Sequence, residues 1–209
     1  MLLSGEGVRD QIAAAERPRR VVDATTLRGV HDLNRQFLGG VLPALQERPT
    51  AIAAVAALTP AARSLAAECP YSLYDFRFAD ADLWRSIAAD SRPALAPPGP
   101  AAAFCRAAAF LTWHLVRSSE LAAPLTLGMV PAVVDLWRTI PLSLLDHVAA
   151  TAAPFLAPRW AGHPTFWSLL VDGAVSGNLE QLAGVRLLGL QLLATDSLPA
   201  RLAPVAAVR

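Results

Sequence analysis

Histidine and cysteine, the side chains most often used as metal ligands and nucleophiles, are few and scattered in this sequence. The four histidines do not recur at a spacing that would place two of them on one face of a helix; they are His31, His114, His147 and His163. A zinc site needs three or four ligands close together. The sequence therefore predicts no metal and no cofactor. A catalytic site around His147, His163 and Trp160 is an alternative hypothesis, the third after the two functions given at the end of this section.

The two cysteines do not stand in a setting that activates a thiol. Cys69 precedes Pro70 at the expected end of a helix, and Cys105 lies in an apolar helical stretch beside Arg106. A reactive thiolate normally needs a helix N-terminus or a nearby cation, and here Arg106 and Cys105 both fit a half-buried helix. No glycine-rich phosphate loop, nucleophile elbow or paired-carboxylate motif is present in the sequence. We therefore expect a protein that is not an enzyme.

All 18 basic residues are arginines, and they concentrate only near the N-terminus. This concentration is the candidate DNA contact, because each arginine can neutralise a backbone phosphate; its members are Arg17, Arg19, Arg20, Arg28 and Arg35. The alternative is a solvated arm. The net charge of +1 over 209 residues argues against strong DNA binding by this chain alone.

The composition is that of a folded helical protein. Hydrophobic residues make up 54% and charged residues 17%, which excludes a disordered chain, and two cysteines exclude a disulfide framework. The apolar stretches are interrupted by Arg106, Pro124 and Pro131, so they predict core helices and no membrane span. The first ten residues are too few and too polar for a signal peptide. These features together lead us to expect a cytoplasmic protein.

Helix signals run through the first half of the chain. Apolar residues at helical spacing predict a long helix over 23–45, capped by Asp23 or Thr25. Its Gly39-Gly40 pair suggests close approach by another backbone. Helices over 49–58 and 60–67 follow. The stretch 71–78 alternates as a short strand or extended segment does, and Asp80 or Asp82 is expected to cap the helix after it.

The second half repeats this organisation after a proline-rich segment. We expect helices over 101–121, 127–137, 141–151, 165–171 and 178–194, with irregular chain between 151 and 164. The predicted boundaries are a flexible arm at 1–22, helical repeat 1 at 23–91, a linker at 92–100, helical repeat 2 at 101–195 and a C-terminal tail at 196–209.

Two segments match each other across the halves. The sequence of Leu58–Ile87 aligns with that of Thr139–Leu170 when two short insertions are allowed. The paired positions are Pro60 with Pro141, Arg77-Phe78 with Arg159-Trp160, and Trp84 with Trp167. Two similar helical units on one chain can pack as a two-fold dimer does. We therefore predict an all-α fold made of two tandem helical repeats that pack as a pseudo-dimer.

The first half resembles a known family at several of these residues. The stretch His31–Arg48 is similar to the first helix of the flagellar transcriptional regulator FlhD, in Asp32, Leu33, Asn34, Phe37 and Leu38. The following "LTPAARSLAA" and "LYDFRFADADLW" resemble that family's leucine-threonine helix and Phe-Arg-Phe-Asp segment, and Leu127–Met129 and Leu179–Ala194 resemble its Leu-Gly step and last long helix. Tyr74 stands where the family has a cysteine, so no disulfide is carried over.

The resemblance implies an all-α subunit that assembles with a protein partner, as FlhD does with the zinc-binding FlhC. Its expected function is transcription regulation with weak or partner-dependent DNA contact. The alternative is an accessory subunit that binds no DNA and serves another complex, such as an enzyme. Large side chains and glycines of the matching segments form the expected partner interface: Phe37, Gly39, Gly40, Phe76, Arg77, Phe78, Trp84, Trp160 and Trp167. Arg77 is also expected to pair with Asp75 or Asp80.

Overall fold

The computed structural model describes residues 22–45, 50–90 and 99–197. Helices dominate these residues, and the only strands among them form one two-stranded ladder, so the all-α prediction is confirmed. Most of the arm at 1–22, most of the linker at 92–100 and most of the tail at 196–209 lie outside the described residues. No helix in the described part of the chain is both long and apolar enough to cross a membrane.

The first half begins with the predicted long helix, which ends earlier than expected. Asp23 caps it by accepting hydrogen bonds from the backbone N–H groups of Thr25 and Thr26, both at 2.8 Å. Thr59 and Asp80 cap two later helices. In order, the elements are α2 (Ala24–Gln36), a π turn η1 (Phe37–Val41), η2 (Leu42–Ala44), α3 (Thr50–Ala53), η3 (Ala54–Ala57), α4 (Pro60–Ala67), β1 (Tyr74–Asp75) and α5 (Ala81–Ala89).

The second half holds the two longest helices. The segment expected to be irregular contains a strand that sequence reasoning missed, and the helix predicted over 127–137 is shifted because Gly128 ends one helix and Pro131 starts the next. The elements are α6 (Pro100–Ser118), α7 (Ala122–Leu127), α8 (Pro131–Thr139), η4 (Leu142–Leu144), α9 (Leu145–Ala152), η5 (Ala153–Phe155), β2 (Ala157–Pro158), α10 (Phe166–Ser176) and α11 (Leu179–Ser197).

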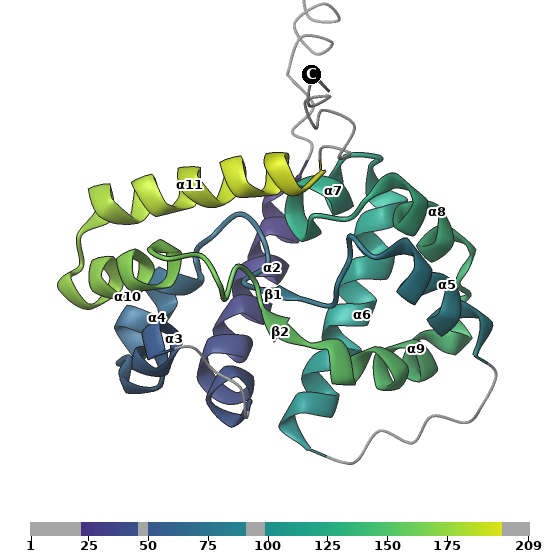
Figure 1. The fold of residues 1–209 in the computed structure, drawn as a ribbon, viewed down its shortest axis with the longest axis horizontal. Coiled ribbons are helices and arrows are strands. Elements are labelled where there is room, and N and C mark those ends of the chain that lie inside the picture. The colour runs from purple at the N-terminus through teal and green to yellow at the C-terminus, as the bar shows by residue number, and fades with distance from the viewer. Residues whose placement is uncertain (1–21, 46–49, 91–98, 198–209) are drawn as a thin grey trace, which may run out of the picture.

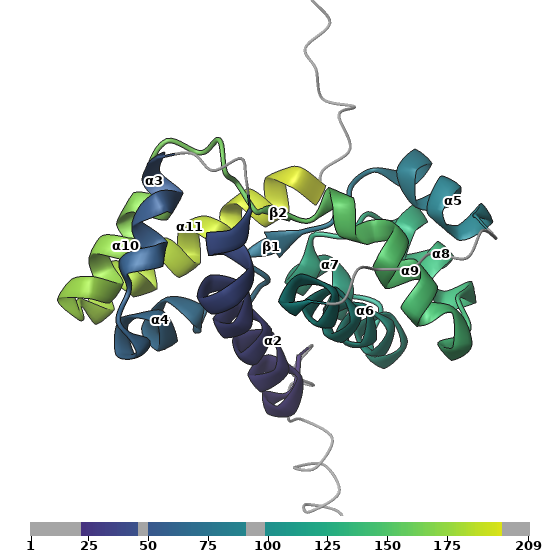
Figure 2. The ribbon, with the colours of Figure 1, turned by 90° about the horizontal axis from the view of Figure 1, so that it is seen from below.

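Two lobes flank a central pair of helices. Helices α2 and α6 contact each other in the middle, and β1 pairs with β2 between the lobes (Figure 1 and Figure 2). One lobe holds α3 and α4 with α10 and α11, and the other holds α8 and α9 with α5. Each lobe therefore contains helices from both halves of the sequence. Helices of both predicted repeats thus pack together in each lobe.

The segments around β1 and β2 share the same local geometry. Antiparallel pairing joins Tyr74 to Pro158 and Asp75 to Ala157. Two residues beyond each strand, Arg77 and Trp160 adopt the left-handed backbone conformation, the only non-glycine residues of the described chain that do. This correspondence makes Tyr74 equivalent to Ala157 and Asp75 to Pro158. The strands therefore pair as equivalent strands do across a two-fold axis.

The same correspondence continues into the following helices. Asp80 accepts from the backbone N–H of Leu83, and His163 accepts from that of Phe166 in the equivalent place. Trp84 and Trp167 are then equivalent and both are buried. This register matches Trp160 with Arg77, whereas the sequence alignment had matched Arg159 with it, so that pairing was wrong by one residue. The packing of two complete repeats as a pseudo-dimer stays a prediction.

Candidate interaction surface

Helix α11 carries apolar residues on two sides. One side is buried against the chain through Leu182, Val185 and Leu193. The other side is exposed, and we call it the α11 stripe; it consists of Leu179, Ala183, Leu187, Leu190 and Ala194. These positions recur every three or four residues, so they lie along one face of the helix. A helix that is apolar on both sides is normally covered on both sides.

The buried side of α11 is held by close contacts to the first half of the chain. The Tyr71 hydroxyl donates to the backbone oxygen of Val185 at 3.2 Å. Tyr71 also lies so close to Gly189 that an added Cβ there would be 1.9 Å from its hydroxyl oxygen. Arg186 donates to Leu65 and pairs with Glu68, both at 3.2 Å. The α11 stripe is therefore displayed on a fixed helix.

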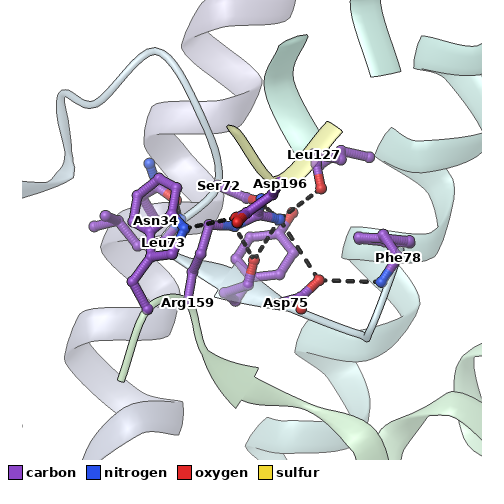
Figure 3. Close-up of polar contacts among 10 residues, drawn as sticks. Asn34, Ser72, Leu73, Asp75, Phe78, Leu127, Arg159 and Asp196 are labelled. Carbon is purple, nitrogen blue, oxygen red and sulfur yellow. Dashed lines mark hydrogen bonds and ion pairs between the residues drawn. The ribbon is translucent and has the colours of Figure 1, made fainter. Parts of the chain in front are cut away.

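A buried arginine joins the two halves beneath α11. Arg159 lies at the centre of the polar contacts in Figure 3, and 6% of its side chain is exposed. It donates to the backbone oxygen of Leu127 at 2.6 Å and to the Ser72 hydroxyl at 3.1 Å. The Asp75 carboxylate lies 3.6 Å away. Burial lowers the pKa of Arg159, and the Asp75 carboxylate opposes that shift.

Trp160 ties this centre to the end of α11. Its indole N–H donates to the Asp196 carboxylate at 3.0 Å, and its ring packs edge-on against Tyr71 and against Phe166. Trp160 is half-buried, so among the expected interface residues it is one that lies near the surface. Its backbone is left-handed, with φ 51°.

A second buried polar group, Asn34, fixes the turn that leads into β1. Its amide donates to the backbone oxygens of Ala67 at 3.1 Å and Tyr71 at 2.9 Å. Its oxygen accepts from the N–H of Leu73 at 2.8 Å, and Figure 3 shows these two residues. Asn34 has no exposed surface. Sequence reasoning noted this residue only through the FlhD resemblance and gave it no structural role.

Replacing Asn34 with alanine is expected to lower the free energy of unfolding by about 2–4 kcal/mol, because it leaves buried carbonyl and amide groups without partners. Chemical denaturation monitored by circular dichroism measures this. The matched change Asn178→Ala, which removes an exposed hydrogen bond to the Gln181 N–H, is expected to cost about 1 kcal/mol. Equal losses in the two variants would contradict the role given to Asn34.

Most of the expected partner interface lies inside the chain. Phe37, Phe76, Phe78, Trp84 and Trp167 are each at most 4% exposed. Four of them pack in one aromatic cluster with Tyr74, Phe104 and Trp137, and Trp167 packs against Phe166. These five side chains therefore cannot contact a partner while the chain keeps this fold, which corrects the expectation for them. Arg77 is exposed and pairs with Asp80 at 2.7 Å, so the predicted ion pair is confirmed.

Gly39 and Gly40 do not make the close contact with another backbone that the sequence predicted. Both lie in the π turn η1, and an added Cβ on Gly39 would meet the Arg63 side chain at 3.3 Å. A Cβ on Gly40 would meet nothing within 4 Å. The close approach expected at Gly39 is therefore made by a guanidinium group, and Gly40 opens onto a groove.

The candidate DNA-binding arginines are divided by the structure. Arg17, Arg19 and Arg20 lie outside the described residues. Arg28 and Arg35 are both exposed on α2, where Arg28 donates to the Thr25 hydroxyl and Arg35 pairs with Asp32 at 2.6 Å. With Asp23 at its start, α2 thus carries as many acidic as basic side chains. The structure does not gather a basic face on this helix.

The histidines of the third hypothesis hold the backbone and form no common site. His147 Nε2 lies 2.7 Å from the backbone oxygen of Asp90, and His163 caps α10. Within residues 22–45, 50–90 and 99–197, no three histidine, cysteine or acidic side chains gather as metal ligands. Ser118 contacts His114 Nε2 at 3.1 Å, but both are exposed and the hydroxyl also donates to the backbone oxygen of His114 at 2.8 Å.

Both cysteines are buried free thiols, and burial raises the pKa of each to about 11. At pH 8 the thiolate is then a minor form, and we expect the native chain to react with a chromogenic disulfide reagent far more slowly than free cysteine does. In 8 M urea both thiols should react at the free rate. Rapid reaction of either thiol in the native protein would contradict this burial.

Comparisons with models of protein families, with curated proteins and with solved structures find no match to this chain.

Proposed function

We propose that this protein is an assembly subunit without catalytic activity of its own, and that it binds a partner protein through the α11 stripe. The observation that carries the proposal is the exposure of large apolar side chains along one helix face. Leu179 is 64% exposed, Leu187 62% and Leu190 38%. Contiguous exposed apolar surface of this kind marks interaction sites in folded proteins. The partner that fits is a protein with an amphipathic helix, which would lie along the stripe.

Two features of the molecule support assembly as its role. The α11 stripe is mounted on a helix that Tyr71, Arg186 and Trp160 fasten to the core. A fixed surface loses little conformational freedom on binding. His147 and His163 contact the backbone, and both cysteines are buried, so none of these four side chains is set up as a nucleophile or base.

The FlhD resemblance would place this assembly in transcription regulation in the cytoplasm. In that role the chain would contribute structure to a complex, and DNA contact would depend on the partner. The balanced charge of α2 favours the alternative, an accessory subunit that touches no DNA. Gel shifts with and without the partner distinguish these roles: a complex that shifts no DNA supports the accessory role.

The variant Leu187→Asp tests the proposed surface. We expect it to fold as the parent does, because Leu187 is exposed, and to lose the protein that co-purifies with the tagged parent from its native cells. The matched control is Leu142→Asp, which changes a leucine that is 54% exposed on η4, away from α11. It should retain that protein. Retention by both variants would show that the partner binds elsewhere.

A further inference from the structure

A groove of about 460 Å³ lies where the π turn η1, helix α4 and the start of helix α6 meet. Its described lining contains one charged side chain, Arg63, and no acidic one. The volume is within the range of small-molecule sites. The groove lies away from the α11 stripe, so its role is independent of the function proposed above.

Arg63 lacks the carboxylate partner that other half-buried or buried arginines of the described chain have. Arg186 pairs with Glu68 and Arg159 lies near Asp75. Arg63 donates from Nη2 to the backbone oxygen of Leu58 at 3.1 Å, and its Nε, like that of Arg186, is a buried atom without a hydrogen-bond acceptor. A guanidinium is always charged and matches the geometry of oxyanions. Its Nη1 group lies beside Gly39, which lines the groove, and is the donor that an anionic ligand there would meet.

The rest of the lining adds to this preference and limits the shape of the ligand. Pro100 begins α6, whose first turn has no side-chain cap and no acidic residue, so its partial positive charge is not offset there. Val41 and Phe104 supply an apolar wall. Gly40 leaves open space beside that wall.

We propose that this groove binds a small organic acid, with its oxyanion on Arg63 and its apolar body against Val41, Gly40 and Phe104. The oxyanion supplies the acceptor that the guanidinium lacks, and the apolar body fills the space that a side chain at position 40 would occupy. Inorganic phosphate has the oxyanion and lacks the apolar body.

Calorimetric titration of the full-length protein with octanoate tests the proposal, with inorganic phosphate as the second probe. We expect saturable octanoate binding, and at least about tenfold weaker binding of phosphate because it lacks the apolar body. Arg63→Gln should weaken octanoate binding at least about tenfold. The control Arg28→Gln, an exposed arginine of α2 outside the groove, should bind octanoate as the parent does.

A second variant tests the apolar part and does not touch Arg63. Gly40→Leu places a side chain in the open space and should also weaken octanoate binding at least about tenfold, while thermal unfolding shows that it is folded. Three results would overturn the proposal: no saturable octanoate binding by the parent, equal affinity in the Gly40→Leu variant, or equal affinity in a folded Arg63→Gln variant. Phosphate binding as tight as octanoate binding would overturn the assignment of an apolar body.

Discussion

The variant Arg159→Leu is expected to unfold with a free energy about 3–4 kcal/mol lower than that of the parent. The change removes the donors to the Leu127 oxygen and the Ser72 hydroxyl, which lie in the buried centre between the two halves. It also removes the cation near the Asp75 carboxylate. Leucine fills much of the space but satisfies none of these groups. Chemical denaturation followed by circular dichroism measures the loss.

The matched control for this variant is Arg85→Leu. Arg85 is 61% exposed and pairs with Asp82 within α5, and such a surface pair contributes about 0–1 kcal/mol. The difference between the two variants isolates burial, since the substitution is the same. A loss below about 1 kcal/mol in Arg159→Leu would mean that the buried arginine does not hold the halves together.

Replacing Gly189 with alanine is expected to cost at least about 3 kcal/mol, although alanine favours helices. The new Cβ would be 1.9 Å from the Tyr71 hydroxyl oxygen and 2.1 Å from the ring carbon that carries it. Tyr71 is fully buried and packs against Trp160 and Phe166, so it cannot move aside freely. Either α11 or the Tyr71 ring must shift, and the contacts of Tyr71 with Trp160 and Phe166 are then lost. Thermal and chemical unfolding measure the cost.

The same helix provides a control of opposite sign. Gly184 of α11 has nothing within 4 Å of an added Cβ, so Gly184→Ala should raise the free energy of unfolding by roughly 0.5–1 kcal/mol. The double variant Tyr71→Ala/Gly189→Ala should lose less stability than the sum of the single changes, because the clash is absent. Additive losses in this cycle would show that Tyr71 does not limit position 189.

Local features of the fold were readable from the sequence because their causes lie within a few residues. Asp23, Thr59 and Asp80 cap the helices that follow them, as side-chain oxygens at those positions predict. The extended character of 71–78 was also correct, since β1 lies within it. These are effects of local hydrogen bonding and backbone sterics, which a single sequence carries.

The arrangement of the lobes was not readable because it depends on contacts between distant segments. Strand β2 is two residues long and forms by pairing with β1. It is too short to show the alternation of apolar and polar residues that predicts a strand. The placement of α5 beside α8 and α9, and of α10 and α11 in the lobe of α3 and α4, follows from such packing. Aromatic residues such as Trp84 and Trp167 fit a core and an interface equally well by type, and their burial in the core decides between the two.

The sequence predicted the helix that carries the α11 stripe, but not that one apolar side of this helix is exposed. The run from Leu179 to Ala194 was recognised as a long helix, and leucines occur on all sides of it. That all-round distribution is itself the signal of a helix covered twice. The sequence does not tell which side this chain covers, because that is set by Tyr71 and Arg186 contacts to residues far away in sequence.

Site-specific photo-cross-linking in the native cells tests most directly the claim that the α11 stripe is the docking surface. The photoreactive residue is placed at Leu187 in one variant and at Arg85, exposed on α5, in the control. We expect one discrete adduct with a different protein from position 187 and none from position 85. No adduct at 187, or the same adduct at both positions, would contradict the claim. An adduct of twice the chain's mass would contradict the proposed hetero-assembly and assign the stripe to a second copy.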